Sequence, residues 1–163
     1  MNVRQGIPII VFVLLVNLFL HTAWEMWQIP FFKGMSEARH GDAVLACTQA
    51  AFGDALIALF AFVFSALTFR KMDWFLMPSK KPLFVYLSVG LIVTIIFEFL
   101  ATEIWNRWAY NSRMPTLPFI GTGLTPLLQW IVIPLVSLVT VKWMYFGFRY
   151  EKYNCRSEND SEN

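Results

Sequence analysis

Four long apolar runs constrain this chain more than any other feature of its sequence. They cover residues 7–27, 48–69, 82–104 and 123–146. Hydrocarbon about 30 Å thick needs roughly 20 apolar residues of helix, and in lipid the backbone must satisfy its own hydrogen bonds. Hydrophobic residues make up 57% of the chain and charged residues 15%, far from the balance of soluble domains. The sequence therefore predicts an all-α, transmembrane four-helix bundle.

The basic residues between the runs predict the orientation, because cytoplasmic connections carry an excess of Lys and Arg. The N-terminus, the second connection and the C-terminal tail contain Arg4, Arg70, Lys71, Lys80, Lys81, Arg149, Lys152 and Arg156. The first and third connections contain only Lys33, Arg39, Arg107 and Arg113. We therefore expect both termini in the cytoplasm and the first and third connections outside.

The connections are too short to hold a second domain, so residues 1–149 are expected to form one bundle. Residues 150–163 are polar and cannot bury enough apolar surface to offset the entropy lost on ordering, so they are predicted to form a disordered cytoplasmic tail. Trp74, Trp105 and Trp143 lie near predicted span ends, where indole rings favour the headgroup zone. Prolines and glycines in residues 108–126 predict a shaped outer loop that caps the bundle.

Polar side chains occur at a similar depth in all four runs. At about 1.5 Å per residue, His21 and Glu98 lie about 9 Å below the outer ends of the first and third spans. Asp54 and Gln129 reach a similar depth on the second and fourth spans. The outer half of the bundle is thus predicted to contain a polar layer. The inner half, at residues 11–16, 59–67, 83–92 and 132–141, has no Asp, Glu, His, Lys or Arg side chain, which argues against a proton or ion path across the whole membrane.

An ionised Asp at the bilayer centre costs about 2.5–3.5 kcal/mol, so the acids of this layer are expected to face inward. The candidate catalytic acid–base residues are His21, Glu25, Asp54 and Glu98. The candidate substrate-binding residues are Asn17, Gln28, Glu103, Asn106, Arg107 and Gln129. Structural roles are the alternative: Asn17 and His21 also suit a bridge between helices. Glu103 and Arg107, spaced i and i+4, suit a surface salt bridge.

Several classes of site lack their residues in this sequence. There is no His-Glu-x-x-His motif, the four apolar runs contain no Glu-x-x-His pair, and no set of histidines is suited to haem, so we expect no metal and no cofactor. The net charge of +2 is small and the basic residues are scattered between the apolar runs, so we expect no nucleic-acid partner.

Three groups of residues resemble a group of small bacterial integral membrane proteins of uncharacterised function. They are Trp24-Glu25-x-x-Gln28-x-Pro30; Cys47 with Gly53-Asp54-Ala-Leu-Ile-Ala58; and Trp108-x-Tyr110 with Met114-Pro115 and Gly-x-Gly-Leu-x-Pro126. In these relatives a His often precedes the Cys, where this chain has Ala46. The resemblance spans most of the chain and implies a multi-pass protein of the bacterial inner membrane, without implying an activity.

Three functions fit these observations. An accessory or assembly subunit of a membrane complex would use the polar faces to contact a partner membrane subunit. A membrane-embedded enzyme would use the Asp, Glu and His side chains on a lipid or isoprenoid at the outer leaflet. A transporter of a small solute or cation would need a homo-oligomer, because four helices enclose little space. Membrane lipids are expected partners in each case.

Overall fold

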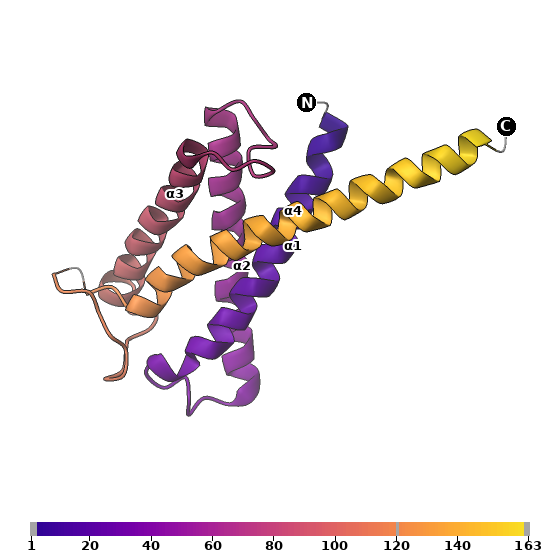
Figure 1. The fold of residues 1–163 in the computed structure, drawn as a ribbon. Helices are drawn as coiled ribbons and strands as arrows, with labels where there is room; N and C mark the ends of the chain where they lie inside the picture. The colour runs from indigo at the N-terminus through magenta and orange to yellow at the C-terminus, as the bar shows by residue number, and fades with distance from the viewer. Residues whose placement is uncertain (1–2, 120, 162–163) are drawn as a thin grey trace.

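The computed structural model describes the backbone of residues 3–119 and 121–161 and the side chains of residues 7–119 and 121–150. Its long helices are α1 (Val3–Gln28), α2 (His40–Thr68), α3 (Lys80–Phe99) and α4 (Leu124–Ser161) (Figure 1). Four segments are long and apolar enough to cross a membrane: Ile7–Phe31, His40–Thr68, Lys80–Ile104 and Leu124–Tyr150. The predicted all-α fold with four such helices is confirmed.

The four helices form a ring in which each one packs against two neighbours. α1 contacts α2 and α4, and α3 contacts the same two helices. The N-terminus and the α2–α3 connection lie at the upper end of Figure 1, and the other two connections lie toward the opposite end. Polar side chains that face the middle of this ring are therefore contributed by several helices at once.

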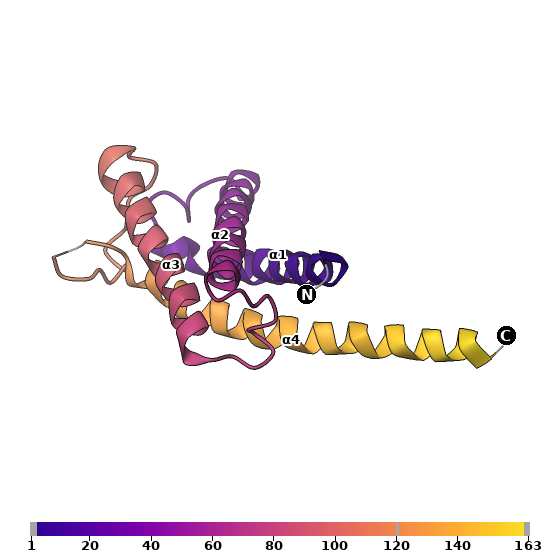
Figure 2. The same cartoon turned by 90° about the horizontal axis from the view of Figure 1, so that it is seen from above.

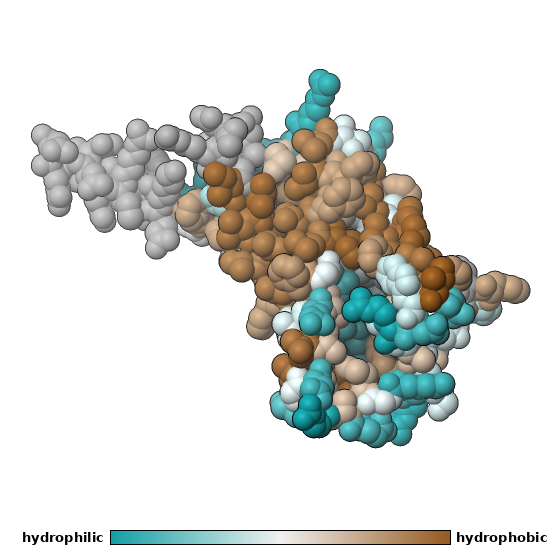
Figure 3. Space-filling model, turned by 180° about the vertical axis from the view of Figure 1, so that it is seen from behind, coloured by the Kyte–Doolittle hydropathy of each residue, from teal (hydrophilic) through white to brown (hydrophobic). Residues whose placement is uncertain are grey.

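The outside of the ring is apolar around its middle. Figure 3 shows a band of hydrophobic side chains across the middle of this face, with most of the hydrophilic side chains gathered below the band and a few above it. Phe19 on α1 is 75% exposed and Phe84 on α3 is 71% exposed, whereas Asn17 and His21 are fully buried. Apolar residues face outward and polar residues inward, as expected of a bundle whose surroundings are lipid.

Small side chains allow the helices to approach one another closely. The buried face of α2 consists mostly of Ala43, Cys47, Ala51, Ala55, Ala58, Ala61, Ser65 and Ala66. In lipid, helices associate largely through such close packing, since burial of apolar surface gains little there. Gly90 has the same role on α3: a Cβ at this position would lie 2.2 Å from Cε3 of Trp130 on α4. Only glycine fits this contact.

The α2–α3 connection contributes two aromatic rings to the core. Trp74 and Phe75 are each 1% exposed, and both pack against Phe62 of α2. The indole of Trp74 therefore does not face the headgroups as expected, because the connection folds back over the end of the bundle and buries it. Trp105 and Trp143 are 50% and 72% exposed, in keeping with a lipid-facing position.

α4 differs from expectation at its C-terminal end. It runs obliquely past the other helices and continues beyond them to Ser161 (Figures 1 and 2), so the helix includes most of the segment predicted to be a disordered tail. Extending an existing helix is much easier than starting one, because each added residue gains a hydrogen bond without a new nucleus. Composition alone does not include this gain from extending a helix, and it therefore predicted disorder.

Candidate functional site

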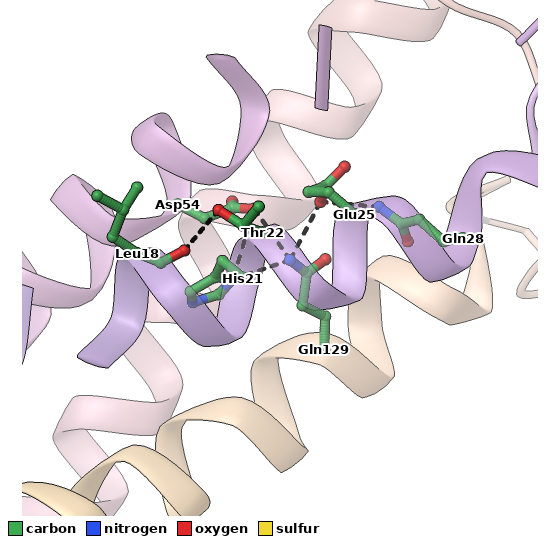
Figure 4. Close-up of polar contacts among 7 residues, drawn as sticks. All are labelled: Leu18, His21, Thr22, Glu25, Gln28, Asp54 and Gln129. Atoms are coloured by element: carbon green, nitrogen blue, oxygen red, sulfur yellow. Dashed lines mark hydrogen bonds and ion pairs between the residues drawn. The ribbon is translucent and has the colours of Figure 1, made fainter. Parts of the chain in front are cut away.

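His21, Glu25, Asp54 and Gln129 meet inside the ring and are here called the polar cluster (Figure 4). Gln129 Nε2 lies 2.8 Å from His21 Nδ1, 3.1 Å from Glu25 Oε1 and 3.0 Å from Asp54 Oδ2. His21 Nδ1 is 3.5 Å from Asp54 Oδ2. The cluster thus joins α1, α2 and α4 through the amide of a single side chain.

Helix periodicity explains how these side chains meet. His21 and Glu25 are one turn apart on α1, and the buried residues Asn17 and Gln28 continue the same face. His21 is held further by Trp130, whose ring centroid lies 5.4 Å away. The polar face of α1 predicted from the spacing is therefore turned into the bundle.

The number of hydrogen-bond donors in the polar cluster does not match the number of acceptors. An amide nitrogen carries two hydrogens, yet three atoms surround Gln129 Nε2 as possible acceptors. If His21 Nδ1 is unprotonated, three acceptors share two hydrogens. If it is protonated, two donors face each other at 2.8 Å. With both carboxyl groups ionised and the amide in this orientation, the cluster in either state lacks one donor or one acceptor that these four side chains do not supply.

The polar cluster also has more acidic than basic groups. Glu25 and Asp54 lie close enough for their charges to interact, and Asp54 also acts on Glu98. Among the side chains that the structure describes, the ion pairs are His21 with Asp54 and Arg39 with Asp42, so no Lys or Arg neutralises the cluster. An added cationic donor would address both the charge and the missing hydrogen bond.

Glu98 lies beside the polar cluster but has its own hydrogen-bond partners. It accepts hydrogen bonds from the Tyr110 hydroxyl and from Trp108 Nε1, the latter at 3.5 Å. Burial, and then the charge of Glu98, raise the pKa of Tyr110 above its ordinary value of 10, so the phenol stays protonated and keeps donating. The sequence analysis assigned neither Trp108 nor Tyr110 to the site. The Trp108-x-Tyr110 pair in the resemblance was the available signal.

The α3–α4 connection, which supplies these two aromatic side chains, is fastened to the short helix η1 (Ile29–Phe31) and the residues after it. Lys33 N donates to Ala109 O at 2.8 Å, and Asn111 N donates to Phe31 O at 3.0 Å. The two connections at this end therefore form one connected cap, in agreement with the loop predicted from its prolines and glycines.

The remaining candidate site residues lie outside the polar cluster and do not form one group with it. Asn17 donates to Ser137 Oγ at 2.7 Å and so bridges α1 and α4, one turn from His21. Gln28 Nε2 donates to Glu25 Oε1 at 2.8 Å and supports that carboxyl group. Bridging is the alternative role that the sequence offered for Asn17.

Glu103, Asn106 and Arg107 are exposed at the end of α3. The predicted salt bridge between Glu103 and Arg107 is wrong, since the ion pairs of the described residues do not include it. A π-helical turn, η2 (Leu100–Ile104), widens the spacing, and Asn106 has a φ of 49°, so these two residues are no longer one helical turn apart.

The exposed part of the polar cluster includes an acidic side chain. The Asp54 side chain is 19% exposed, while His21 is fully buried. Within the described part of the chain, no group of three or more His, Cys, Asp or Glu side chains is arranged to hold a metal ion. The site is therefore best described as partly open, rich in acceptors and suited to a hydrogen-bond donor.

Comparison of the chain with protein-family models, with curated protein sequences and with solved structures gives no match.

Proposed function

We propose that this multi-pass membrane protein binds the protonated primary amine of an amphiphile at the polar cluster. The observation that carries the proposal is the contact of Gln129 Nε2 with three atoms of His21, Glu25 and Asp54, which it cannot satisfy together. A donor that also carries positive charge would complete these bonds and offset the two carboxylates.

A primary ammonium group suits this need better than other cations. It has three N–H donors and no acceptor, and bonds between an ammonium and a carboxylate are stronger than neutral ones. A quaternary ammonium has the charge but no N–H donor, so it would leave the acceptors unpaired. This difference makes the proposal specific for the headgroup chemistry.

The surroundings of the site favour a ligand that is partly in the lipid. His21 is seven residues before the end of α1 at Gln28, which corresponds to a depth of about 10 Å. The acyl chains of an amphiphile would remain against the apolar outer faces of the helices while its amine reaches Asp54. A headgroup at this depth lies within the reach of a lipid in the same leaflet.

The packing beyond the polar cluster disfavours transport. Past the Asn17–Ser137 pair the core is closed by Val13, Phe62 and Val141, each at most 1% exposed. The core is therefore closed on this side of the site. The 3.5 Å contact of His21 with Asp54 favours a second candidate function, in which this pair removes a proton from the bound ammonium and starts a reaction at the amine.

Native mass spectrometry in a gentle detergent tests the proposal. Protein mixed with phosphatidylethanolamine and phosphatidylcholine should retain the ethanolamine lipid in preference, and the double variant E25Q/D54N should lose this preference. The matched control is E37Q/D42N, which removes two exposed carboxylates at the same end of the bundle.

Equal retention of the two lipids by the wild type, or an unchanged preference in E25Q/D54N, would contradict the proposal. Retention of a partner protein in place of lipid would support the accessory role. Residence in a bacterial inner membrane with both termini in the cytoplasm remains our prediction from the charge distribution and the resemblance.

A further inference from the structure

A second, basic site lies at the other end of the bundle, where the α2–α3 connection meets α4. A cavity of about 480 Å³ is lined there by Arg70, Lys71 and Arg149, together with Asp73, Leu76 and Tyr145. Arg70 and Lys71 follow directly on the segment His40–Thr68, and Arg149 lies at the end of Leu124–Tyr150. The cations are therefore at the boundary of the apolar spans, which is the level of lipid headgroups.

The wall of this cavity is fixed by buried aromatic packing. Trp74 and Phe75 follow Asp73 in the chain and are each 1% exposed, and the Phe75 ring lies 6.1 Å from that of Tyr145 on α4. The basic residues are thus attached to a well-packed segment on one side and to α4 on the other. This packing fixes the backbone from which the basic side chains extend.

Arg70 occupies a backbone position that normally favours glycine. It has a φ of 51°, and it ends α2 in a Schellman motif: Arg70 N donates to Leu67 O and Lys71 N donates to Ala66 O. A residue with a side chain is strained in this conformation. The chain therefore keeps a cationic side chain at the mouth of the cavity where glycine would fit more easily.

The charges of the cavity lack internal partners. Three cations face one carboxyl group, Asp73, and among the described side chains none of the three forms an ion pair within 4.0 Å. Leu76 and Tyr145 provide apolar surface beside them. Basic pockets of this kind between membrane helices bind lipid phosphates.

We infer that this cavity binds the phosphate of an anionic phospholipid, in the leaflet opposite to the polar cluster. The cations contact the phosphate oxygens, and the glycerol and the first part of the acyl chains lie against the apolar wall. The site is independent of the amine site, since it shares no residue with it and is at the other end of the helices.

Native mass spectrometry of the protein in dodecylmaltoside, titrated with phosphatidylglycerol, phosphatidylcholine or inorganic phosphate, tests this inference. We expect the wild type to bind phosphatidylglycerol more tightly than phosphatidylcholine. The variant K71Q/R149Q should bind phosphatidylglycerol about 25-fold more weakly, at about fivefold for each cation removed. The control K80Q/K81Q has the same charge change at the same end but lies outside the cavity, and it should bind as the wild type does.

Two results would overturn the inference: an unchanged affinity in K71Q/R149Q, or an equal loss in K80Q/K81Q. If the cavity bound inorganic phosphate but not phosphatidylglycerol, its ligand would not be a lipid phosphate, and the inference would be overturned. The variant R70G removes one cation and is expected to fold normally, because glycine suits the backbone at this position. It should lower the affinity for phosphatidylglycerol about fivefold while unfolding no more easily than the wild type. Wild-type affinity in R70G would overturn the role of this guanidinium.

Discussion

The most informative substitution in this chain is Gln129→Leu, which keeps the approximate size of the side chain and removes both of its N–H donors. Three atoms, on His21, Glu25 and Asp54, then lose their shared partner. A buried acceptor without a donor costs about 1–3 kcal/mol, whereas a side-chain hydrogen bond in a membrane bundle averages about 0.6 kcal/mol. For two bonds these values span about 1 to about 6 kcal/mol, and because Asp54 is 19% exposed and can recruit water, we expect a loss in the lower part of this span, about 1–3 kcal/mol.

Unfolding in mixed micelles of dodecylmaltoside and sodium dodecyl sulfate, followed by circular dichroism, measures this loss. Gln49→Leu is the matched control, because Gln49 is exposed on α2 and the same change there alters the hydrophobicity of the chain equally. Q49L should stay within about 0.5 kcal/mol of the wild type. If Q129L were as stable as Q49L, the amide would not be holding the polar cluster together, and the reasoning would be refuted.

Three further substitutions test the packing and the loops. Gly90→Ala should destabilise the bundle by about 1–3 kcal/mol in the same unfolding assay, because the added Cβ would meet Trp130 at 2.2 Å; a neutral effect would show that this contact is wrong. Tyr110→Phe should loosen the α3–α4 connection, seen as faster hydrogen exchange at its amides, since Glu98 loses a donor. The raised pKa of Tyr110 means that the folded chain holds the phenol proton more tightly than the unfolded one, so the wild type should lose stability above pH 10 and Y110F should lose less. Arg70→Gly should raise stability by about 0.5–1 kcal/mol, measured in the same micelles, and a loss would contradict the strain at this residue.

Hydropathy and helix periodicity were sufficient to predict the four helices and the inward direction of the polar residues. Counting residues from the span ends places His21, Asp54 and Gln129 at one level, and in the structure these side chains are in contact. It succeeded because the rise per residue is constant and the span ends are marked by the change from apolar to polar residues.

Tertiary contacts account for what the sequence did not reveal. Trp74 is in the core and not at the headgroups because the connection folds back, a path that composition does not encode. The π-helical turn before Trp105 moved Glu103 and Arg107 apart, since a spacing rule holds only within a regular α-helix. The contact of Tyr110 with Glu98 depends on a loop closing over distant residues, so no local pattern predicts it.

The central claim, that an amine enters the polar cluster, is tested most directly by solid-state NMR in bilayers. Protein with ¹³C-labelled carboxyl groups on Asp and Glu would be reconstituted with phosphatidylethanolamine carrying ¹⁵N in its headgroup. We predict magnetisation transfer between the headgroup nitrogen and the carboxyl carbons of Asp54 and Glu25, and its loss in E25Q/D54N but not in E37Q/D42N. Transfer to exposed carboxyl groups alone, with none to Asp54 or Glu25, would contradict the account.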